Sequence, residues 1–227
     1  MSTYVLMKIL ESTPARYDLG IRLLTLGRLD KTYDRITACI KAGQKALDIG
    51  CGTGALTLRG ARKNAWVKGI DINPEMLEIA GKRAAEANLL QNIDLCEIGI
   101  AELGNEAPEY YDIVMSGLCF SELSADELTF ALQQIKKILK PGGHLLIVDE
   151  VSPRSFFKRV IYGLARLPLV IITYLITQTT TKTVKHLPEQ IENAGLQIKS
   201  LKLSRLENFA EIIAAKSLNK AASLADS

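Results

Sequence analysis

The chain has 227 residues, 48% of them hydrophobic and 23% charged, so it is long enough to bury one core and too ordinary in composition for wholesale disorder or several membrane spans. A net charge of +3, with no Lys/Arg run longer than a pair, argues against a nucleic-acid ligand. Four scattered cysteines, two histidines and an N-terminus without a secretory pattern argue against a metal site and for free thiols in the cytoplasm.

The order of apolar segments along the chain indicates the fold. Residues 14–43 are expected to form one or two helices, within an N-terminal region, 1–44, that covers the site. From 45 to about 218, short apolar segments alternate with segments of helical periodicity, which predicts an α/β fold with a doubly wound, mainly parallel sheet covered on both faces. The expected strands span 45–50, 66–72, 92–98, 110–117 and 144–150, and the expected helices 55–63, 74–90 and 124–140.

Capping residues mark several helix ends. Asn73 and Ser124 are typical N-caps, Glu127 completes a capping box with Ser124, and KPGG at 140–143 is expected to stop a helix. The remaining elements are a short helix over 187–195, two strands at the sheet edge over 196–204 and 208–217, and a frayed tail over 219–227.

The most informative segment is ALDIGCGTGALT, residues 46–57, in which Asp48 closes a buried strand and glycines follow at every second position. Such a loop lets a ligand lie directly on the backbone, at the edge where open α/β sheets bind ligands. Its G-x-G-x-G spacing differs from the G-x-G-x-x-G of dinucleotide sites. The Asp48 carboxylate favours an ammonium over a pyrophosphate, and Asp71, ending the next strand, is placed to accept two ribose hydroxyls. The pair favours S-adenosylmethionine (SAM) over NAD.

Three motifs in order, LDIGCGTG, GIDINPEML and LKPGGHLLI, resemble those of class I SAM-dependent methyltransferases over most of residues 45–150. The resemblance implies SAM as cofactor, S-adenosylhomocysteine as product, and a seven-stranded Rossmann-like sheet. It also implies that the last strand, NFAEIIAAKS, is inserted antiparallel.

Further segments resemble narrower groups. TPARYDLGIRLLTLGRL and VDEVSP are similar to the ubiquinone/menaquinone C-methyltransferase group, which acts on lipophilic quinone precursors. ESTPARYD, MSGLCFSELSADEL and VIITYLITQTTTK resemble methyltransferases labelled corrinoid-protein-associated. These resemblances leave the acceptor open between an apolar small molecule and a partner (corrinoid) protein.

The cofactor-binding residues follow from the loop and the resemblance. Ile72 is expected to pack on the adenine, and Ser116 and Leu118 to lie near the transferring methyl. One departure is Gly99, which stands where many relatives have an Asp that binds the adenine amino group; backbone around Gly99 and Ile100, or Glu102 reaching back, would replace it. The full set is Tyr17, Asp48, Gly50, Cys51, Gly52, Thr53, Gly54, Asp71, Ile72, Gly99, Ile100, Ser116 and Leu118.

Three residues are candidates for catalysis. Asp149 and Glu150 close the fifth strand where ligands bind, and burial can raise the pKa of such a carboxyl towards neutrality; Glu150 is the preferred base. Glu122 and His186 are further candidates, with capping or exposure as the alternatives. Cys119 is expected to be a small buried hydrophobe. Methyl transfer from a sulfonium requires mainly alignment, so few catalytic groups are expected.

The insertion at about 152–187 contains an unusually apolar stretch, 156–176. Arg166 and Pro168 interrupt it, so a membrane span is disfavoured, since a span needs about 20 apolar residues. The stretch is expected to form a lid over the acceptor site, a contact with a membrane surface or a partner protein, or a helix pair that closes the core. The function is accordingly predicted as methyl transfer to an apolar acceptor, with a partner-directed methyltransferase or a SAM-binding protein without turnover as alternatives, and an NAD-dependent oxidoreductase as a distant one.

Overall fold

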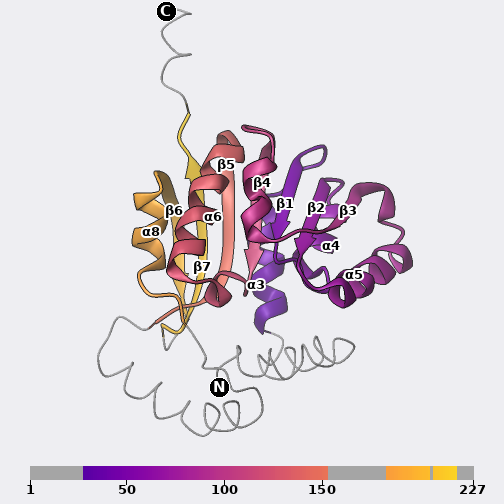
Figure 1. Ribbon diagram of the computed structural model, residues 1–227. Helices are drawn as coiled ribbons and strands as arrows, with labels where there is room; N and C mark the ends of the chain where they lie inside the picture. The colour runs from indigo at the N-terminus through magenta and orange to yellow at the C-terminus, as the bar shows by residue number, and fades with distance from the viewer. Residues whose placement is uncertain (1–27, 153–182, 205–206, 219–227) are drawn as a thin grey trace, which may run out of the picture.

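The computed structural model describes residues 28–152, 183–204 and 207–218, which form a seven-stranded sheet in the order β3-β2-β1-β4-β5-β7-β6 (Figure 1). Strands β1 to β5 pair in parallel, and β7 lies antiparallel between β5 and β6. The predicted α/β sheet with an antiparallel last strand is confirmed. The strands are β1 (Lys45–Ile49), β2 (Trp66–Asp71), β3 (Ile93–Glu97), β4 (Tyr111–Gly117), β5 (Leu139–Glu150), β6 (Leu196–Leu203) and β7 (Phe209–Lys216).

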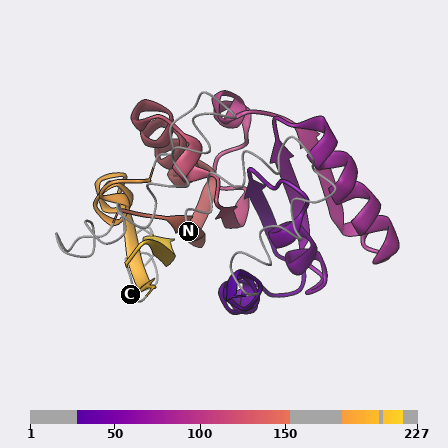
Figure 2. The ribbon, with the colours of Figure 1, turned by 90° about the horizontal axis from the view of Figure 1, so that it is seen from below.

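Helices cover both faces of the sheet, as the view from below shows (Figure 2). One apolar cluster joins α3, α4 and α5 to one face, and a second joins the 3-10 helix η3, α6 and α8 to the other. The central strands have few exposed positions because both of their faces are buried, which is why their sequences are continuously apolar. The helices are α3 (Arg28–Ile36), α4 (Ala55–Ala61), α5 (Pro74–Glu86), η3 (Ile100–Asn105), α6 (Ala125–Ile138) and α8 (Leu187–Asn193).

The predicted caps are present where the sequence places them. The Asn73 side chain accepts hydrogen bonds from the N–H groups of Glu75 and Met76, and Ser124 and Glu127 form a reciprocal capping box. These contacts fix the first turns of α5 and α6, and both turns border the site described below.

One boundary differs from the prediction. Helix α6 ends at Ile138, just before 140–143, but β5 begins at Leu139, so this segment lies inside the strand rather than ahead of a strand that starts at 144. Tyr111 of β4 pairs with Leu139, whereas Ile113 pairs with His144, so the extra residues form an irregularity in which Gly142 has a φ of 77°. A bulge can keep such a segment in the strand, and the Pro-Gly-Gly composition alone does not distinguish a bulge from a helix end.

Several predicted features lie outside the described residues: the part of the N-terminal region up to residue 27, with Tyr17; most of the insertion 152–187, with its apolar stretch 156–176; and the tail 219–227. Within 28–152, 183–204 and 207–218, no helix combines the length and apolarity that crossing a membrane requires.

Candidate functional site

A cavity of about 410 Å³ opens where the carboxyl ends of β1, β2, β3 and β4 meet. This is the edge at which parallel α/β sheets bind ligands, because the loops that follow the strands converge there. The described lining residues are Ile49, Gly50, Gly52, Ile70, Asp71, Ile72, Asn73, Met76, Ile98, Gly99, Ile100, Gly117, Leu118, Cys119, Glu122, Leu123 and Glu127.

The glycine loop forms one wall of this cavity. Gly50, Gly52 and Gly54 have φ values of 66°, 52° and 83°, a backbone conformation that side chains rarely adopt. Gly50 also has no room for a side chain, since a Cβ there would lie 2.5 Å from the Sγ of Cys119. At Gly52 a Cβ would meet no atom within 4 Å, so the backbone faces open space in the cavity wall.

Asp71 links the loop to the end of β2. Its Oδ2 accepts a hydrogen bond of 2.8 Å from the Gly52 N–H, and its Oδ1 accepts one of 2.9 Å from the Asn73 N–H. Each carboxylate oxygen has a second lone pair, so the group retains acceptor capacity towards the cavity. The carboxylate therefore shapes the loop and presents acceptors to a ligand at the same time.

Asp48 lies beneath the loop and does not line the cavity. Its side chain is buried, Oδ2 accepts a 2.6 Å hydrogen bond from the Thr57 hydroxyl, and Oδ1 finds no donor among the described residues. Burial raises the pKa of Asp48 to about 7, and the negative charge of nearby Asp71 adds to the rise, although Thr57 opposes it. A ligand in the cavity would therefore face Asp48 only across the loop.

Ile72 and the end of β3 form an apolar slot. Ile72 is 75% exposed, which is unusual for a large hydrophobic side chain next to a buried strand, and it lines the cavity. A Cβ on Gly99 would lie 3.3 Å from Ile72 Cγ2, so the absence of a side chain at Gly99 leaves the slot narrow but open. The Gly99 N–H donates to Glu102 Oε2 at 2.7 Å, so the Glu102 carboxylate holds the backbone of Gly99.

The segment after β4 forms the opposite wall. Leu118 lines it in the left-handed conformation, with a φ of 61°, and its N–H donates to Val148 O at 2.8 Å. Cys119 packs against Gly50, and burial raises the pKa of its thiol, which disfavours a nucleophilic thiolate. Ser116, by contrast, is buried below the cavity, where its hydroxyl donates to Ile49 O at 3.2 Å.

The three catalytic candidates do not converge. Glu122 lines the cavity, whereas Glu150 is buried at the end of β5, paired across the sheet with Phe209. His186 lines a second cavity, of about 690 Å³, together with Val184 and residues of β6. The remaining predicted cofactor residues Cys51, Thr53 and Gly54 lie in the loop but not among the cavity-lining residues.

The charge of the cavity is one-sided. Asp71, Glu122 and Glu127 line it, and its described lining residues include no Lys, Arg or His. Asp48 and Asp149 add two buried carboxyls behind the walls. Such a site attracts cations and repels phosphate groups. Sequence reasoning identified Glu127 and Asn73 only as caps, because their place in the wall depends on how α5 and α6 pack. Among the described residues, no cluster of His, Cys, Asp and Glu has the composition of a metal site.

In comparison with known proteins, residues 46–143 match the family described as methyltransferase domain. Curated relatives include a demethylmenaquinone methyltransferase of Tropheryma whipplei, 32% identical over 59% of this chain and 54% of the relative. A ubiquinone/menaquinone biosynthesis C-methyltransferase of Vibrio vulnificus is 28% identical over 64% and 57%. A ubiquinone biosynthesis O-methyltransferase of Acinetobacter baumannii is 31% identical over 70% and 66%. The match thus spans a little over half the length of the first two relatives.

Solved structures agree on the fold. A [4+2]-cyclase superposes with a TM-score of 0.68 at 21% identity, covering 84% of this chain and 81% of the cyclase. A magnesium protoporphyrin IX methyltransferase of Synechocystis with bound S-adenosylhomocysteine gives 0.64 at 21% identity, with coverages of 83% and 84%. Because a cyclase and a methyltransferase share this fold, the reaction has to be argued from the site.

Proposed function

Since the chain carries a methyltransferase domain of the class I fold, we propose that it is a SAM-dependent methyltransferase that transfers the methyl group to an apolar small-molecule acceptor. The observation that supports this proposal most directly is the acidic cavity at the glycine loop. SAM carries an ammonium, a carboxylate and a sulfonium, and its net charge is positive. A dinucleotide carries a pyrophosphate, which the three lining carboxylates would repel.

Each wall has a role in this proposal. The backbone at Gly50 and Gly52 lies against the methionine part of SAM, with the charge of Asp48 behind it. Asp71 accepts the ribose hydroxyls with the lone pairs that Gly52 and Asn73 leave unused. The exposed Ile72 covers one face of the adenine.

The segment after β4 faces the reacting end. Leu118 and Cys119 exclude water from the sulfonium, and Glu122 supplies a carboxylate to the same wall. Alignment of acceptor, methyl and sulfur in one line is the main demand of this displacement and contributes roughly 7–11 kcal/mol in well-oriented systems. The scarcity of further catalytic groups in the described wall is consistent with that demand.

An apolar acceptor is supported by two observations. The curated relatives are named for steps in menaquinone and ubiquinone biosynthesis. In addition, the wall beside Glu122 is apolar, with Leu118 and Leu123.

The test is calorimetric titration of the purified chain with SAM, with NADH as the phosphate-bearing comparison. We expect SAM to bind and NADH not to bind. Asp71→Ala should weaken SAM binding about a hundredfold, because two hydrogen bonds to a charged group are lost. Asp112→Ala, at the opposite edge of the sheet, is the matched control and should leave SAM affinity unchanged.

Turnover is tested by measuring S-adenosylhomocysteine formation with a panel of lipophilic phenols and quinols. Product formed in the presence of acceptor supports the proposal. SAM binding without product for any acceptor would favour the SAM-binding protein without turnover. NADH binding with no SAM binding would overturn the assignment.

A further inference from the structure

Asp149 is a buried carboxylate that joins two elements at the edge of the cavity. Its side chain is 0% exposed at the end of β5. Oδ2 accepts hydrogen bonds from the N–H groups of Phe120, at 2.8 Å, and Ser121, at 3.3 Å, and Oδ1 accepts one from the Glu150 N–H at 2.7 Å. Three backbone donors therefore converge on one side chain that does not itself line the cavity.

The segment that Asp149 holds is the cavity wall after β4, residues 118–123. Regular pairing of β4 with β5 ends just before it, and the Leu118 N–H bonds to Val148 O as the chain turns away. Leu118 adopts a left-handed conformation that is uncommon for a branched side chain. Four of its six residues line the cavity: Leu118, Cys119, Glu122 and Leu123.

We propose that Asp149 is a positioning residue, which fixes the 118–123 wall against the methyl-bearing end of SAM by accepting the backbone N–H groups of Phe120 and Ser121. This inference rests on the proposed function. Only a carboxylate offers acceptors on both oxygens to the three donors, whereas an Asn would turn an NH₂ group towards at least one backbone N–H.

The titratable groups near Asp149 among the described residues come from β5, from the segment it holds and from the glycine loop and the end of β2. Glu150 follows it on β5, and Cys119 and Glu122 lie on the segment it holds; Asp48 and Asp71 reach the same region across the glycine loop, and its partner on β7 is Ala210. Burial raises the pKa of Asp149 to about 6, against the opposing effect of the hydrogen bonds from Ser121, Glu150 and Phe120. Protonation below pH 6 therefore removes an acceptor from the N–H groups of the wall.

The experiment compares Asp149→Asn with Asp112→Asn by SAM calorimetry and thermal unfolding. Asp112 is the matched control because it also accepts a backbone N–H, from Lys45 at 2.8 Å, but at the amino edge of the sheet. Asp149→Asn should weaken SAM binding about tenfold, the cost of leaving a buried donor unpaired. Asp112→Asn should leave it unchanged. Wild-type affinity should also decrease as pH falls from 7 to 5, and the part of this decrease centred near pH 6 should be absent in Asp149→Asn.

Equal SAM affinities in wild type and Asp149→Asn, or equal losses in both variants, would overturn the inference while leaving the proposed function standing. If wild type binds no SAM, the proposed function fails. If Asp149→Asn does not fold, hydrogen exchange on the wild type decides. The protection factors of the Phe120 and Ser121 amides should fall about tenfold between pH 7.5 and 5 relative to those of Ile147 and Val148, which pair within the sheet. Constant relative protection would refute the role of Asp149.

Discussion

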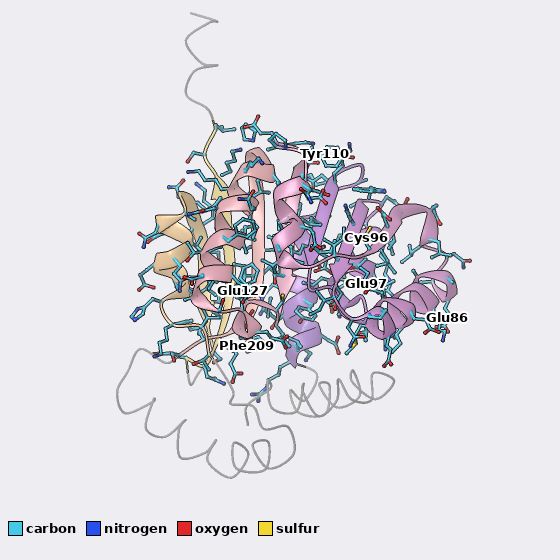
Figure 3. The ribbon with its side chains drawn as sticks, viewed as in Figure 1. Glu86, Cys96, Glu97, Tyr110, Glu127 and Phe209 are labelled. Atoms are coloured by element: carbon cyan, nitrogen blue, oxygen red, sulfur yellow. The ribbon has the colours of Figure 1, made fainter. Side chains whose placement is uncertain are left out.

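Acidic side chains have different partners at the two ends of the parallel strands. The amino ends of β1 to β5 form what we call the amino edge of the sheet, and their carboxyl ends form the carboxyl edge. At the amino edge, where Figure 3 shows Tyr110, carboxylates meet lysines: Asp112 with Lys140 at 2.8 Å and Glu109 with Lys216 at 3.0 Å. At the carboxyl edge, near Glu127 and Phe209 in the same view, Asp48 and Asp149 are buried and accept hydrogen bonds from neutral hydroxyl and N–H donors. At one edge the partners of the carboxyls are cations, and at the other they are neutral donors.

The pKa shifts express this difference. Near the amino edge, burial pushes the pKa of Glu106 up, but hydrogen bonds from Lys68 and Tyr111 and the charge of Lys68 bring it below its usual value. At the carboxyl edge, burial prevails and raises the pKa of Asp48 to about 7. The amino edge thus stabilises ionised carboxylates in the protein alone, whereas the carboxyl edge holds carboxyls whose ionisation a bound cation would favour.

The largest effect on stability is expected in the glycine loop, where Gly50 and Gly52 both have a positive φ but differ in the space left for a side chain. Gly50→Ala should lower the free energy of unfolding by about 3 kcal/mol or more, because the new Cβ would overlap Cys119 in addition to adopting a positive φ. Gly52→Ala meets no atom and should cost only about 1 kcal/mol, from the backbone alone. Urea unfolding measures both.

The two substitutions should rank in the opposite order in their effect on SAM affinity. The open space at Gly52 belongs to the cavity, so Gly52→Ala should reduce SAM affinity more than its small stability loss would suggest. Equal stability losses in the two variants would show that Cys119 moves aside and that the loop is less tightly packed than the structure indicates.

Much of the carboxyl edge was predictable from the sequence because its signals are local. The alternation of apolar segments predicted the sheet, and the spacing of Gly50, Gly52 and Gly54 predicted the turn at the end of β1. The sequence also predicted that Asp71 ends β2, because the apolar segment that forms the strand stops there. Local periodicity and turn chemistry were enough for these features.

The rest depends on contacts between distant segments. The sequence predicts a start of β5 at 144 and not at Leu139. The pairing of Leu139 with Tyr111 determines where the strand begins, and the composition of 140–143 does not reveal that pairing. Asp48 was expected beside the ligand, yet it lies behind the loop, held by Thr57 from the helix that follows. The hydrogen bonds from the Phe120 and Ser121 N–H groups to Asp149 join residues about 29 positions apart in the sequence, so no local pattern predicts them.

The next effect concerns how the free energy of unfolding depends on pH through Asp48. Unfolded Asp48 releases its proton near pH 4, but the folded protein keeps it until about pH 7, so the native state binds more protons between these values. Wild type should therefore lose stability as pH rises through this window. Relative to wild type, Asp48→Asn should gain about 1.4 kcal/mol per pH unit between pH 5 and 6.5. Urea unfolding at closely spaced pH values measures the difference.

The same substitution has a counterpart in binding. Because SAM is cationic, bound SAM should lower the pKa of Asp48, so wild-type affinity should increase between pH 6 and 8, with release of a proton. Asp48→Asn should lose this increase. A constant stability difference across pH would mean that Asp48 is ionised in the empty protein, and the contrast between the two edges would then fail at its clearest point.

The smallest effect is expected at the amino edge. Lys140→Met removes the partner of Asp112 in an ion pair that is 40% and 24% exposed on its two sides. Exposed pairs of this kind contribute only about 0.5 kcal/mol, and salt screens them, so the loss should shrink further in about 1 M NaCl, where charges interact over only a few ångströms. Asp112 keeps the Lys45 N–H as a donor, which limits the damage. SAM affinity should stay within a factor of about two of wild type, because a charge at this edge lies across the length of the strands from the cavity. Urea unfolding at low and high salt measures the loss of stability, and calorimetry measures SAM affinity. A large fall in SAM affinity would mean that the two edges are electrostatically coupled through the sheet.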